Sequence, residues 1–424
     1  MSTSSQDHDE RIVLHNCAVL DTVNGKLISG SHILIGHGRI IQVSQEPIYG
    51  PGMQAINMNG LVVMPGLIDC HVHCMASNLN LRLNANLPNV FAALKSLPIL
   101  EGMLFRGFTT VRDAGGADWS LSEATRTGLV KGPRIFPAGK ALSQTGGHGD
   151  FRPRSDVIEP CACAQKLGSI SRIVDGVDAV RLAVREEIQK GATQIKIMAS
   201  GGIASPNDPI HFLGFSEDEI RAAVEEAGNA GTYVMAHAYT PEAIIRAVRC
   251  GVRTIEHGSL INQAAADVMA RAGAFLVPTT ITYEALAADG AKLGFPAASI
   301  AKLEAVRVAA KAALKIAEAA GVQVAYGSDL LGESHAHQSS ELQIRADASG
   351  NAQAIRSATT VAAAVLQMQG ELGVIQAGAV ADLLVIDGNP LQDIRLLLNQ
   401  GEHIRAIMKD GQFVKNTLAF RIEK

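Results

Sequence analysis

Residues 61–73 read LVVMPGLIDCHVH, in which an apolar stretch of strand length, Leu61–Asp69, leads into two histidines, His71 and His73. Seven further apolar segments of strand length follow: Thr109–Asp113, Arg134–Ala138, Gln194–Met198, Tyr233–Ala236, Arg253–Glu256, Ala274–Pro278 and Gln323–Gly327. Helical segments separate most of them, for example Ser216–Ala230, Pro241–Cys250, Ile261–Ala272 and Ile300–Ala320. Eight strands alternating with helices over roughly 300 residues predict an α/β fold with a closed, TIM-like (β/α)₈ barrel.

The alternative architecture is an open, doubly wound sheet. We find no glycine-rich dinucleotide fingerprint after the first strand, so the barrel is favoured. The connection from Gly139 to Thr193 is unusually long. It holds one predicted helix, Gly176–Lys190, and a stretch rich in glycine, proline and arginine, Ser143–Pro160. Long loops in compact domains are usually functional, so we expect part of this connection to lie near the site.

Both ends of the chain differ from the middle, because they contain short strands with turn residues between them. The predicted strands are Arg11–Leu14, Ser31–Ile35, Arg39–Val43, Ala381–Asp387, Ile404–Lys409 and Gln412–Val414. The simplest interpretation is that the two ends pair into one small β-sandwich beside the barrel. We therefore expect residues 1–62 and 371–424 to form the sandwich and residues 63–370 to form the barrel.

Composition limits the classes of function. Hydrophobic residues make up 47% of the 424 residues and charged residues 18%, so a large core is possible. A formal net charge of −4 argues against nucleic acid or an anionic membrane as the main partner. The six cysteines form no regular framework, and the polar N-terminus contains no secretory signal pattern. No apolar run of about 18 residues exists, so we expect a cytoplasmic protein without a membrane span.

Potential metal ligands follow five of the predicted strands. These residues are His71 and His73 after the first strand, Lys196 in the fourth, His237 after the fifth, His257 after the sixth and Asp329 after the eighth. In a barrel, the carboxyl ends of the strands share one face, and barrel enzymes place their active sites there. This convergence predicts a metal centre more strongly than any single motif does.

Each of these residues also has an ordinary structural explanation. A lone histidine after a strand is commonly structural, and Asp329 follows a strand where it would serve as a helix N-cap. Lys196 lies in a buried strand and must be ion-paired, reach solvent or lose its charge. A neutral amine can instead react with carbon dioxide to form a carbamate, whose two oxygens suit two cations. The His-x-His spacing puts His71 and His73 on one side of the strand, where both can hold one metal ion.

Together these motifs resemble the amidohydrolase superfamily. The segment Pro65–Asp69, PGLID, followed by His71 and His73 is similar to its opening signature, and residues 377–385, AGAVADLLV, resemble its return to the sandwich. More narrowly, KIMASGG at 196–202, TGGH at 145–148 and HAY at 237–239 are similar to the imidazolonepropionase-related branch. Within that branch the chain resembles the Xaa-Pro dipeptidase and carboxypeptidase-like group, which includes ochratoxin-hydrolysing amidohydrolases.

The resemblance implies two divalent cations, zinc by the family pattern. His71, His73 and Asp329 would hold one metal and His237 and His257 the other, with carboxylated Lys196 as the bridge. Asp329 would also transfer the proton that the departing amine needs, because an amide anion is a poor leaving group. The resemblance further implies a homo-oligomer, an octamer in this group.

The predicted substrate side rests on donors that can hold a carboxylate. His148, Arg152 and Arg154 lie in the long connection and Tyr239 follows His237, although the two arginines also fit a solvated loop. His211, His335 and His337 are expected at the surface. The leading hypothesis is hydrolysis of an N-acyl or N-aminoacyl amino acid, such as a dipeptide or an ochratoxin-like amide. The alternatives are hydrolysis of a cyclic amide or of a urea or carbamate xenobiotic, and a non-catalytic scaffold.

Overall fold

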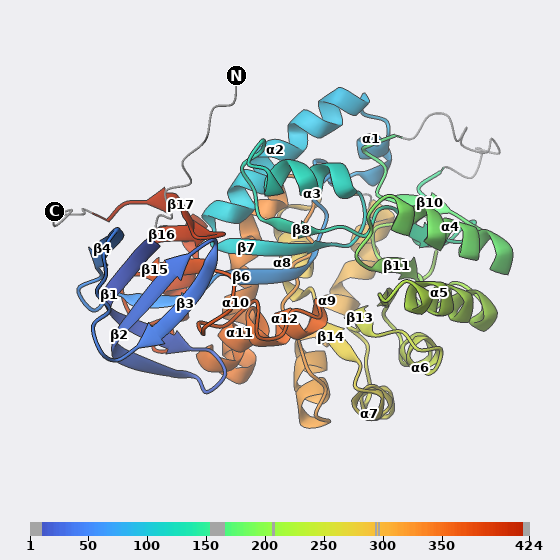
Figure 1. Cartoon of the computed structure of the whole chain (residues 1–424). Helices are drawn as coiled ribbons and strands as arrows, with labels where there is room; N and C mark the ends of the chain where they lie inside the picture. Colours follow the sequence, from blue (N-terminus) through green and yellow to red (C-terminus); the bar gives the residue numbers. More distant parts are fainter. Residues whose placement is uncertain (1–10, 153–165, 206–207, 293–294, 296, 419–424) are drawn as a thin grey trace, which may run out of the picture.

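The computed structural model describes residues 11–152, 166–205, 208–292, 295 and 297–418 (Figure 1). Its central part contains two parallel sheets. The first has the order β6 (Leu67–Val72), β7 (Phe108–Asp113) and β8 (Arg134–Phe136). The second has the order β10 (Ser171–Ile173), β9 (Ala141–Ser143), β11 (Ile195–Met198), β12 (Val234–Ala238), β13 (Thr254–His257) and β14 (Phe275–Val277).

The segment predicted as the eighth strand, Gln323–Gly327, closes the barrel without forming a regular ladder. The Leu276 amide donates to the Gln323 carbonyl over 3.0 Å, and the Cys70 amide donates to the Tyr326 carbonyl over 2.9 Å. The segment therefore joins β14 to β6. At the other seam, the Gln194 side chain donates to the carbonyls of Asp113 and Phe136. These contacts complete the α/β barrel that the sequence predicts.

The first predicted strand is divided in the structure. Val62–Pro65 forms β5 in the terminal sheet, and the chain then crosses into the barrel as β6. Gly66 makes the crossing possible, because a Cβ atom at this position would overlap the Thr109 side chain. The apolar run continues through the crossing, since both halves are buried.

The two ends of the chain pair with each other as predicted. The eight terminal strands form one hydrogen-bonded sheet, in which β15 joins β5 from the N-terminal part. Its strands are β1 (Arg11–Asp21), β2 (Lys26–Gly36), β3 (Arg39–Ser44), β4 (Met53–Asn57), β5, β15 (Leu383–Ile386), β16 (Ile404–Lys409) and β17 (Gln412–Asn416). Their inward side chains, including Leu14, Ile33, Val63 and Leu383, form one core.

The predicted helices are present, and capping residues fix where they begin. Ser216 forms a capping box with Glu219, and Thr240 and Asn262 cap the next two helices. The helices of the barrel region are α1 (Leu81–Ala85), α2 (Asn89–Phe105), α3 (Trp119–Arg126), α4 (Val177–Gln189), α5 (Glu217–Asn229), α6 (Pro241–Arg249), α7 (Gln263–Ala272), α8 (Thr280–Asp289), α9 (Ala297–Ala319), α10 (Glu341–Ser349), α11 (Asn351–Ser357), α12 (Thr360–Val365) and the 3₁₀ helix η1 (Gly332–Ser340).

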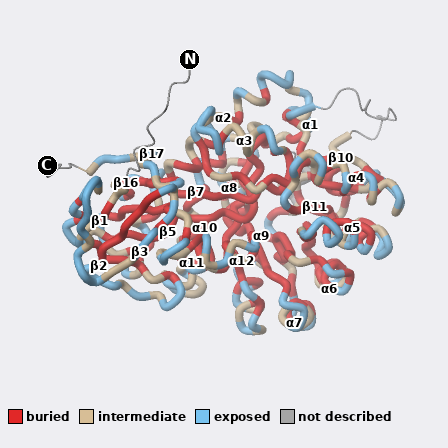
Figure 2. Tube along the Cα trace, in the orientation of Figure 1, coloured by how far each residue is buried: buried red, intermediate tan, exposed pale blue. Residues whose placement is uncertain are grey.

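Alternation along the barrel strands separates core side chains from lumen side chains. Ile195 and Ile197 of β11 pack outward into the apolar cluster beneath the helices, so Lys196 between them faces the lumen. The same alternation applies to β7 and β13. Val111 and Ile255 pack outward, so Arg112 and Glu256, which follow them directly in the sequence, face the lumen. Figure 2 shows the buried residues running through the centre of the barrel.

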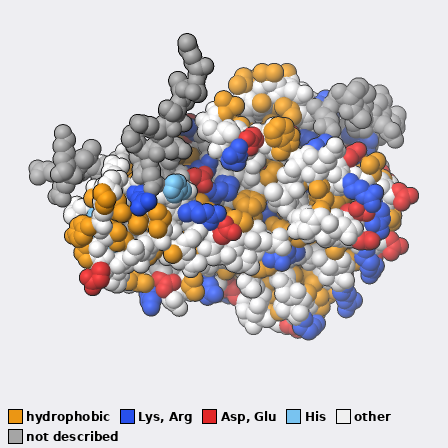
Figure 3. All heavy atoms as spheres, in the orientation of Figure 1, with side chains coloured by type: hydrophobic (Ala, Val, Ile, Leu, Met, Phe, Trp, Pro, Cys, Tyr) orange, Lys and Arg blue, Asp and Glu red, His pale blue; other side chains and the backbone are white. Residues whose placement is uncertain are grey.

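The outer surface carries several exposed apolar side chains on α1 and α2, among them Leu83, Phe91 and Leu94 (Figure 3). None of the described helices is long and apolar enough to cross a membrane. His335, which we expected at the surface, is buried in η1, where its Nε2 lies 3.2 Å from the Ala76 carbonyl. Burial lowers its pKa to about 3, so the ring is a neutral internal partner of the backbone.

Candidate functional site

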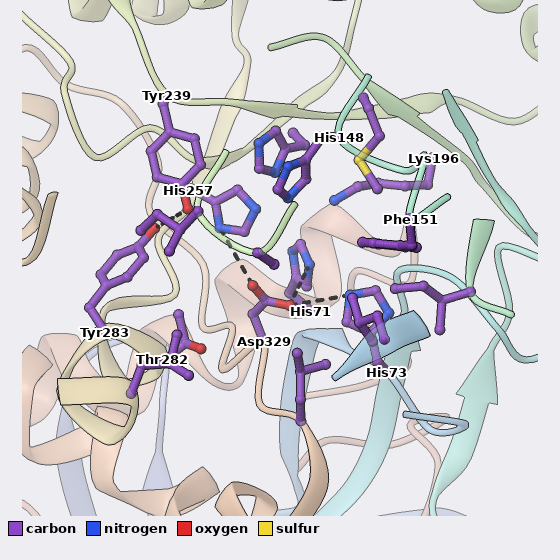
Figure 4. A pocket seen from close by; sticks show the side chains of 18 of the residues that line it. His71, His73, His148, Phe151, Lys196, Tyr239, His257, Thr282, Tyr283 and Asp329 are labelled. Carbon is purple, nitrogen blue, oxygen red and sulfur yellow. Dashed lines mark hydrogen bonds and ion pairs between the residues drawn. The ribbon is translucent and has the colours of Figure 1, made fainter. Parts of the chain in front are cut away.

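All six predicted ligands line one cavity at the carboxyl ends of the barrel strands (Figure 4): His71, His73, Lys196, His237, His257 and Asp329. Asp329 lies at the centre. Its Oδ1 is 3.4 Å from His71 Nε2 and 3.2 Å from His73 Nε2, and its Oδ2 is 3.9 Å from His257 Nδ1. The potential ligand atoms of His71, His257 and Asp329 all lie within 4.8 Å of one another, so these residues form a group able to hold a metal ion.

The second nitrogen of each histidine is already engaged by the protein. The Nδ1 atoms of His71, His73 and His257 contact Glu256 Oε2 at 2.6 Å, the Gly115 carbonyl at 2.9 Å and Thr279 Oγ1 at 2.7 Å, respectively. Nε2 of His71 and of His73 is thereby left facing Asp329, and Nε2 of His257 is left without a hydrogen bond within the described residues. Histidines that bind metals are commonly held in this way, because the outer hydrogen bond fixes the tautomer and the ring orientation. The donor set therefore fits a metal centre.

His237 is held through its other nitrogen. Its Nε2 lies 3.1 Å from the Gly201 carbonyl, which leaves Nδ1 as the atom available to a ligand. The ring stacks on His148, with centroids 4.1 Å apart and an interplanar angle of 20°. Burial and the neighbouring histidines and Lys196 hold the pKa of His237 well below its ordinary value, so the ring is neutral and ready to bind a cation.

Asp329 occupies an unusual backbone position. Its φ is +50°, and its amide donates to the His71 carbonyl over 2.8 Å, which ties the eighth segment to β6. Left-handed backbone at a residue other than glycine is concentrated at functional sites. Burial opposes ionisation of the carboxyl, but His71, His73 and His257 outweigh it and hold the pKa of Asp329 well below its usual range.

Lys196 is 1% exposed, and its side chain extends toward the cavity (Figure 4). Burial lowers the pKa of its amine to about 8, although Glu256 and Asp329 act in the opposite direction. A substantial fraction of the amine is then neutral near pH 8, as a reaction with carbon dioxide requires.

Two important lumen residues, Arg112 and Glu256, were not identified from the sequence. Arg112 donates to both carboxylate oxygens of Glu256 over 2.9 and 3.0 Å, and to the Cys70 carbonyl over 2.6 Å. Glu256 in turn accepts from His71. The signal was present in strand alternation, because both residues lie one position away from outward-facing apolar residues. Only the closed barrel brings them together.

The predicted substrate residues separate into two groups. His148 and Tyr239 line the cavity, and the Tyr239 ring stacks on His257 with centroids 5.2 Å apart. The Arg152 guanidinium is paired with the Asp150 carboxylate at 2.7 Å, and Arg152 is not among the described residues that line the cavity. Arg154 lies outside the described residues.

Two further features of the cavity were also missed. His148 Nδ1 lies 3.0 Å from Asp208 Oδ2 and 2.9 Å from Ser205 Oγ, which hold its ring in place. The remaining wall is mostly apolar and is contributed by several loops and helices: Leu81, Phe151, Ile170, Ile203, Leu286, Phe295 and Leu331. An apolar wall beside a group of metal ligands suits a substrate that presents a hydrophobic part next to its reacting bond.

Comparison with known proteins agrees with this geometry. A model of the amidohydrolase family matches residues 62–414. The chain is 32% identical to an ochratoxinase of Aspergillus niger over 368 residues, which cover 84% of this chain and 76% of that protein. A crystal structure of a prolidase complexed with N-methylphosphonate-L-proline is 60% identical, with a TM-score of 0.94 over 96% of this chain and 100% of the other. A Xaa-Pro dipeptidase with methionine in its active site is 29% identical, with a TM-score of 0.85 over 96% and 100% of the two chains. Because the family model spans most of its length, this protein belongs to the amidohydrolase family and is a metal-dependent hydrolase.

Proposed function

We propose that this amidohydrolase cleaves the amide bond of an N-acyl or N-aminoacyl amino acid and releases the C-terminal amino acid. The observation that carries the proposal is a single cavity that combines metal ligands, hydrogen-bonding groups for a carboxylate and an apolar wall. The prolidase relative that was crystallised with a proline phosphonate supports a substrate of dipeptide type. The ochratoxinase relative supports a bulky acyl group as a further possibility within the same class.

The proposed cofactor is a pair of divalent cations, expected to be zinc. His71, His73 and Asp329 would hold one cation and His237 and His257 the other. Lys196 would bridge them as a carbamate, for which its burial and its place in the same cavity as the histidines are the support. Such cations polarise a carbonyl and make water acidic enough to attack at neutral pH.

Side chains of the protein would transfer the proton and bind the substrate carboxylate. Asp329 lies at the centre of the ligands with its carboxyl ionised, so it can accept a proton from the attacking water and return it to the leaving amine. His148 and Tyr239 face the cavity from two sides and can donate to a carboxylate. Arg152 and Arg154 remain predictions, and in the structure the Arg152 guanidinium is paired with Asp150.

The apolar wall would bind the acyl or N-terminal side chain of the substrate. Phe151, Ile203 and Phe295 come from three separate loops and face the same cavity as the ligands. Each methylene of a substrate that becomes buried there contributes about 0.8 kcal/mol, which is roughly fourfold in affinity. We therefore expect kcat/KM to rise at least about fourfold as the acyl or N-terminal side chain grows from glycine to leucine or phenylalanine, and up to about 200-fold for leucine when all four added carbons are buried.

The experiment is a panel of zinc-loaded assays that measure the liberated amino acid. It includes Xaa-Pro dipeptides with small, charged and apolar first residues, N-acyl amino acids, ochratoxin A, and matched substrates with an amidated C-terminus. Apolar substrates with a free carboxylate should be hydrolysed fastest, and chelation should abolish the activity. If no amino acid is released while a cyclic amide, urea or carbamate in the same panel is cleaved, the xenobiotic alternative replaces this proposal.

The assembly and location of the protein remain predictions. A homo-oligomer, an octamer by resemblance, would cover some of the exposed apolar side chains on α1 and α2. A cytoplasmic location is expected from the composition and from the sequence features described above. Sedimentation of the zinc-loaded protein tests the first of these expectations.

A further inference from the structure

A row of hydroxyl groups runs along one wall of the cavity. Tyr283 Oη lies 3.1 Å from Tyr239 Oη and 2.8 Å from Ser259 Oγ. The Tyr239 ring stacks on the ring of His257. All three hydroxyl-bearing residues are buried. Figure 4 shows the contact between the two tyrosines beside His257.

The number of available protons sets the direction of this row. Tyr283 has one proton, which it donates to Tyr239, so the contact between Ser259 and Tyr283 has Ser259 as its donor.

The hydroxyl of Tyr239, the last in the row, therefore has one available orientation. A phenol O–H lies close to the ring plane and has two preferred positions. In Tyr239 one of these directions receives the proton of Tyr283, so its own O–H takes the other. That proton has no acceptor in the wall row and is available to a substrate oxygen in the cavity. A donor fixed before the reaction needs no reorganisation, and a chain of hydrogen bonds strengthens its terminal donor.

We propose that Tyr283 is a positioning residue that directs the Tyr239 proton toward the substrate. The inference rests on the proposed function, because it assigns Tyr239 a substrate oxygen as its acceptor. It adds a requirement beyond the positions of the candidate metal ligands, namely that the Tyr239 hydroxyl be oriented. Tyr239 needs Tyr283, although Tyr283 itself makes no bond to the reacting atoms.

The test is a double-mutant cycle with Tyr283→Phe and Tyr239→Phe in zinc-loaded protein. Tyr283→Phe should lower kcat/KM about 5- to 10-fold, the scale of one neutral hydrogen bond, with unchanged zinc content. In the Tyr239→Phe background the same change should have almost no effect. The matched control is Ser259→Ala, which removes one donor to Tyr283 but leaves the proton that Tyr283 gives to Tyr239. Its kcat/KM should stay within about twofold of wild type.

A second measurement does not depend on turnover. The affinity for N-methylphosphonate-L-proline, measured by calorimetry, should fall by a similar factor in Tyr283→Phe and not fall further when Tyr239→Phe is added. If Tyr283→Phe fails to fold, Ser259→Ala/Tyr283→Phe gives the same test without a stranded serine hydroxyl. Equal binding in wild type and Tyr283→Phe, or fully additive losses in the cycle, overturns the assignment. A wild-type protein that hydrolyses no amide substrate instead refutes the proposed function, whatever the binding data show.

Discussion

Glu256→Gln is the most informative single change in the barrel lumen. The carboxylate of Glu256 accepts two hydrogen bonds from Arg112, at 2.9 and 3.0 Å, one from His71 Nδ1 at 2.6 Å and one from Thr254 at 2.5 Å. Burial raises its pKa, but Arg112 and His71 outweigh this effect and keep the carboxyl ionised. Glutamine has the same shape, but it removes the charge and places an NH₂ group against two donors.

Two effects of different size follow from this change. Arg112 is fully buried and would lose its only ion-pair partner within the described residues. Removing one partner of a buried ion pair destabilises a protein by about 3–5 kcal/mol. His71 would lose its charged acceptor, because glutamine offers it at most a neutral amide oxygen, and loss of such a partner lowers metal affinity about 10- to 100-fold. We expect both effects in Glu256→Gln.

The assay separates the two effects. Thermal unfolding of chelator-treated protein reports the stability, and competition with a chromophoric chelator reports the zinc affinity. The matched control is Glu187→Gln on α4. Glu187 is also buried and accepts from Arg172 at 3.0 Å and Lys190 at 3.4 Å, but it is not among the residues that line the cavity. Glu187→Gln should lower stability and leave zinc affinity unchanged. Wild-type zinc affinity in folded Glu256→Gln would show that His71 needs no carboxylate partner.

The other predictions address the proton carrier, substrate binding and stability. Asp329→Asn should lower kcat at least ~100-fold while much of the zinc stays bound; near-normal turnover in metal-replete protein refutes its role. In His148→Ala, amidation of the substrate carboxylate should have little further effect on kcat/KM, and additive losses place His148 elsewhere. Burial raises the pKa of Glu341 from 4.5 to about 8, so its contribution to stability is present below pH 4.5 and is lost as pH rises through 8. Glu341→Gln should flatten that part of the Tm–pH curve, and curves of identical shape contradict this assignment.

The barrel and the gathering of the six candidate ligands in one cavity were predictable because both follow from local patterns. Apolar strands followed by helices specify the fold, and the ends of parallel strands must share a face. His237 and His257 lie twenty residues apart, a separation that spans one strand–helix–strand step, so adjacency could be read directly from the chain. The ligand residues therefore needed no long-range information beyond closure of the barrel.

The remaining features depend on contacts that no local pattern encodes. Arg112 and Glu256 are 144 residues apart in sequence, and each alone resembles an isolated charge in a strand. Strands β9 and β10 have three residues each, too few to show a period of two. The change of sheet at Gly66 was hidden because apolar residues are equally suitable on both sides of it. Tyr283 was missed because it lies in a helix, where a tyrosine is ordinarily part of the core.

The charges in the lumen support the proposed carboxylation of Lys196. Arg112 and Glu256 form a buried ion pair of zero net charge. In the same lumen, the positive charge of a protonated Lys196 would balance the negative charge of Asp329. The cavity would then have zero net charge, which is a poor match for two divalent cations. A carbamate changes the balance to two negative charges, so carboxylation favours metal binding and metal binding favours carboxylation to the same extent.

Zinc reconstitution in buffer free of carbon dioxide should therefore give fewer than two equivalents per chain, and added bicarbonate should restore the second. In Lys196→Ala, bicarbonate should make no difference to zinc uptake. Two equivalents bound by wild type without carbon dioxide would show that Lys196 does not act as a carbamate.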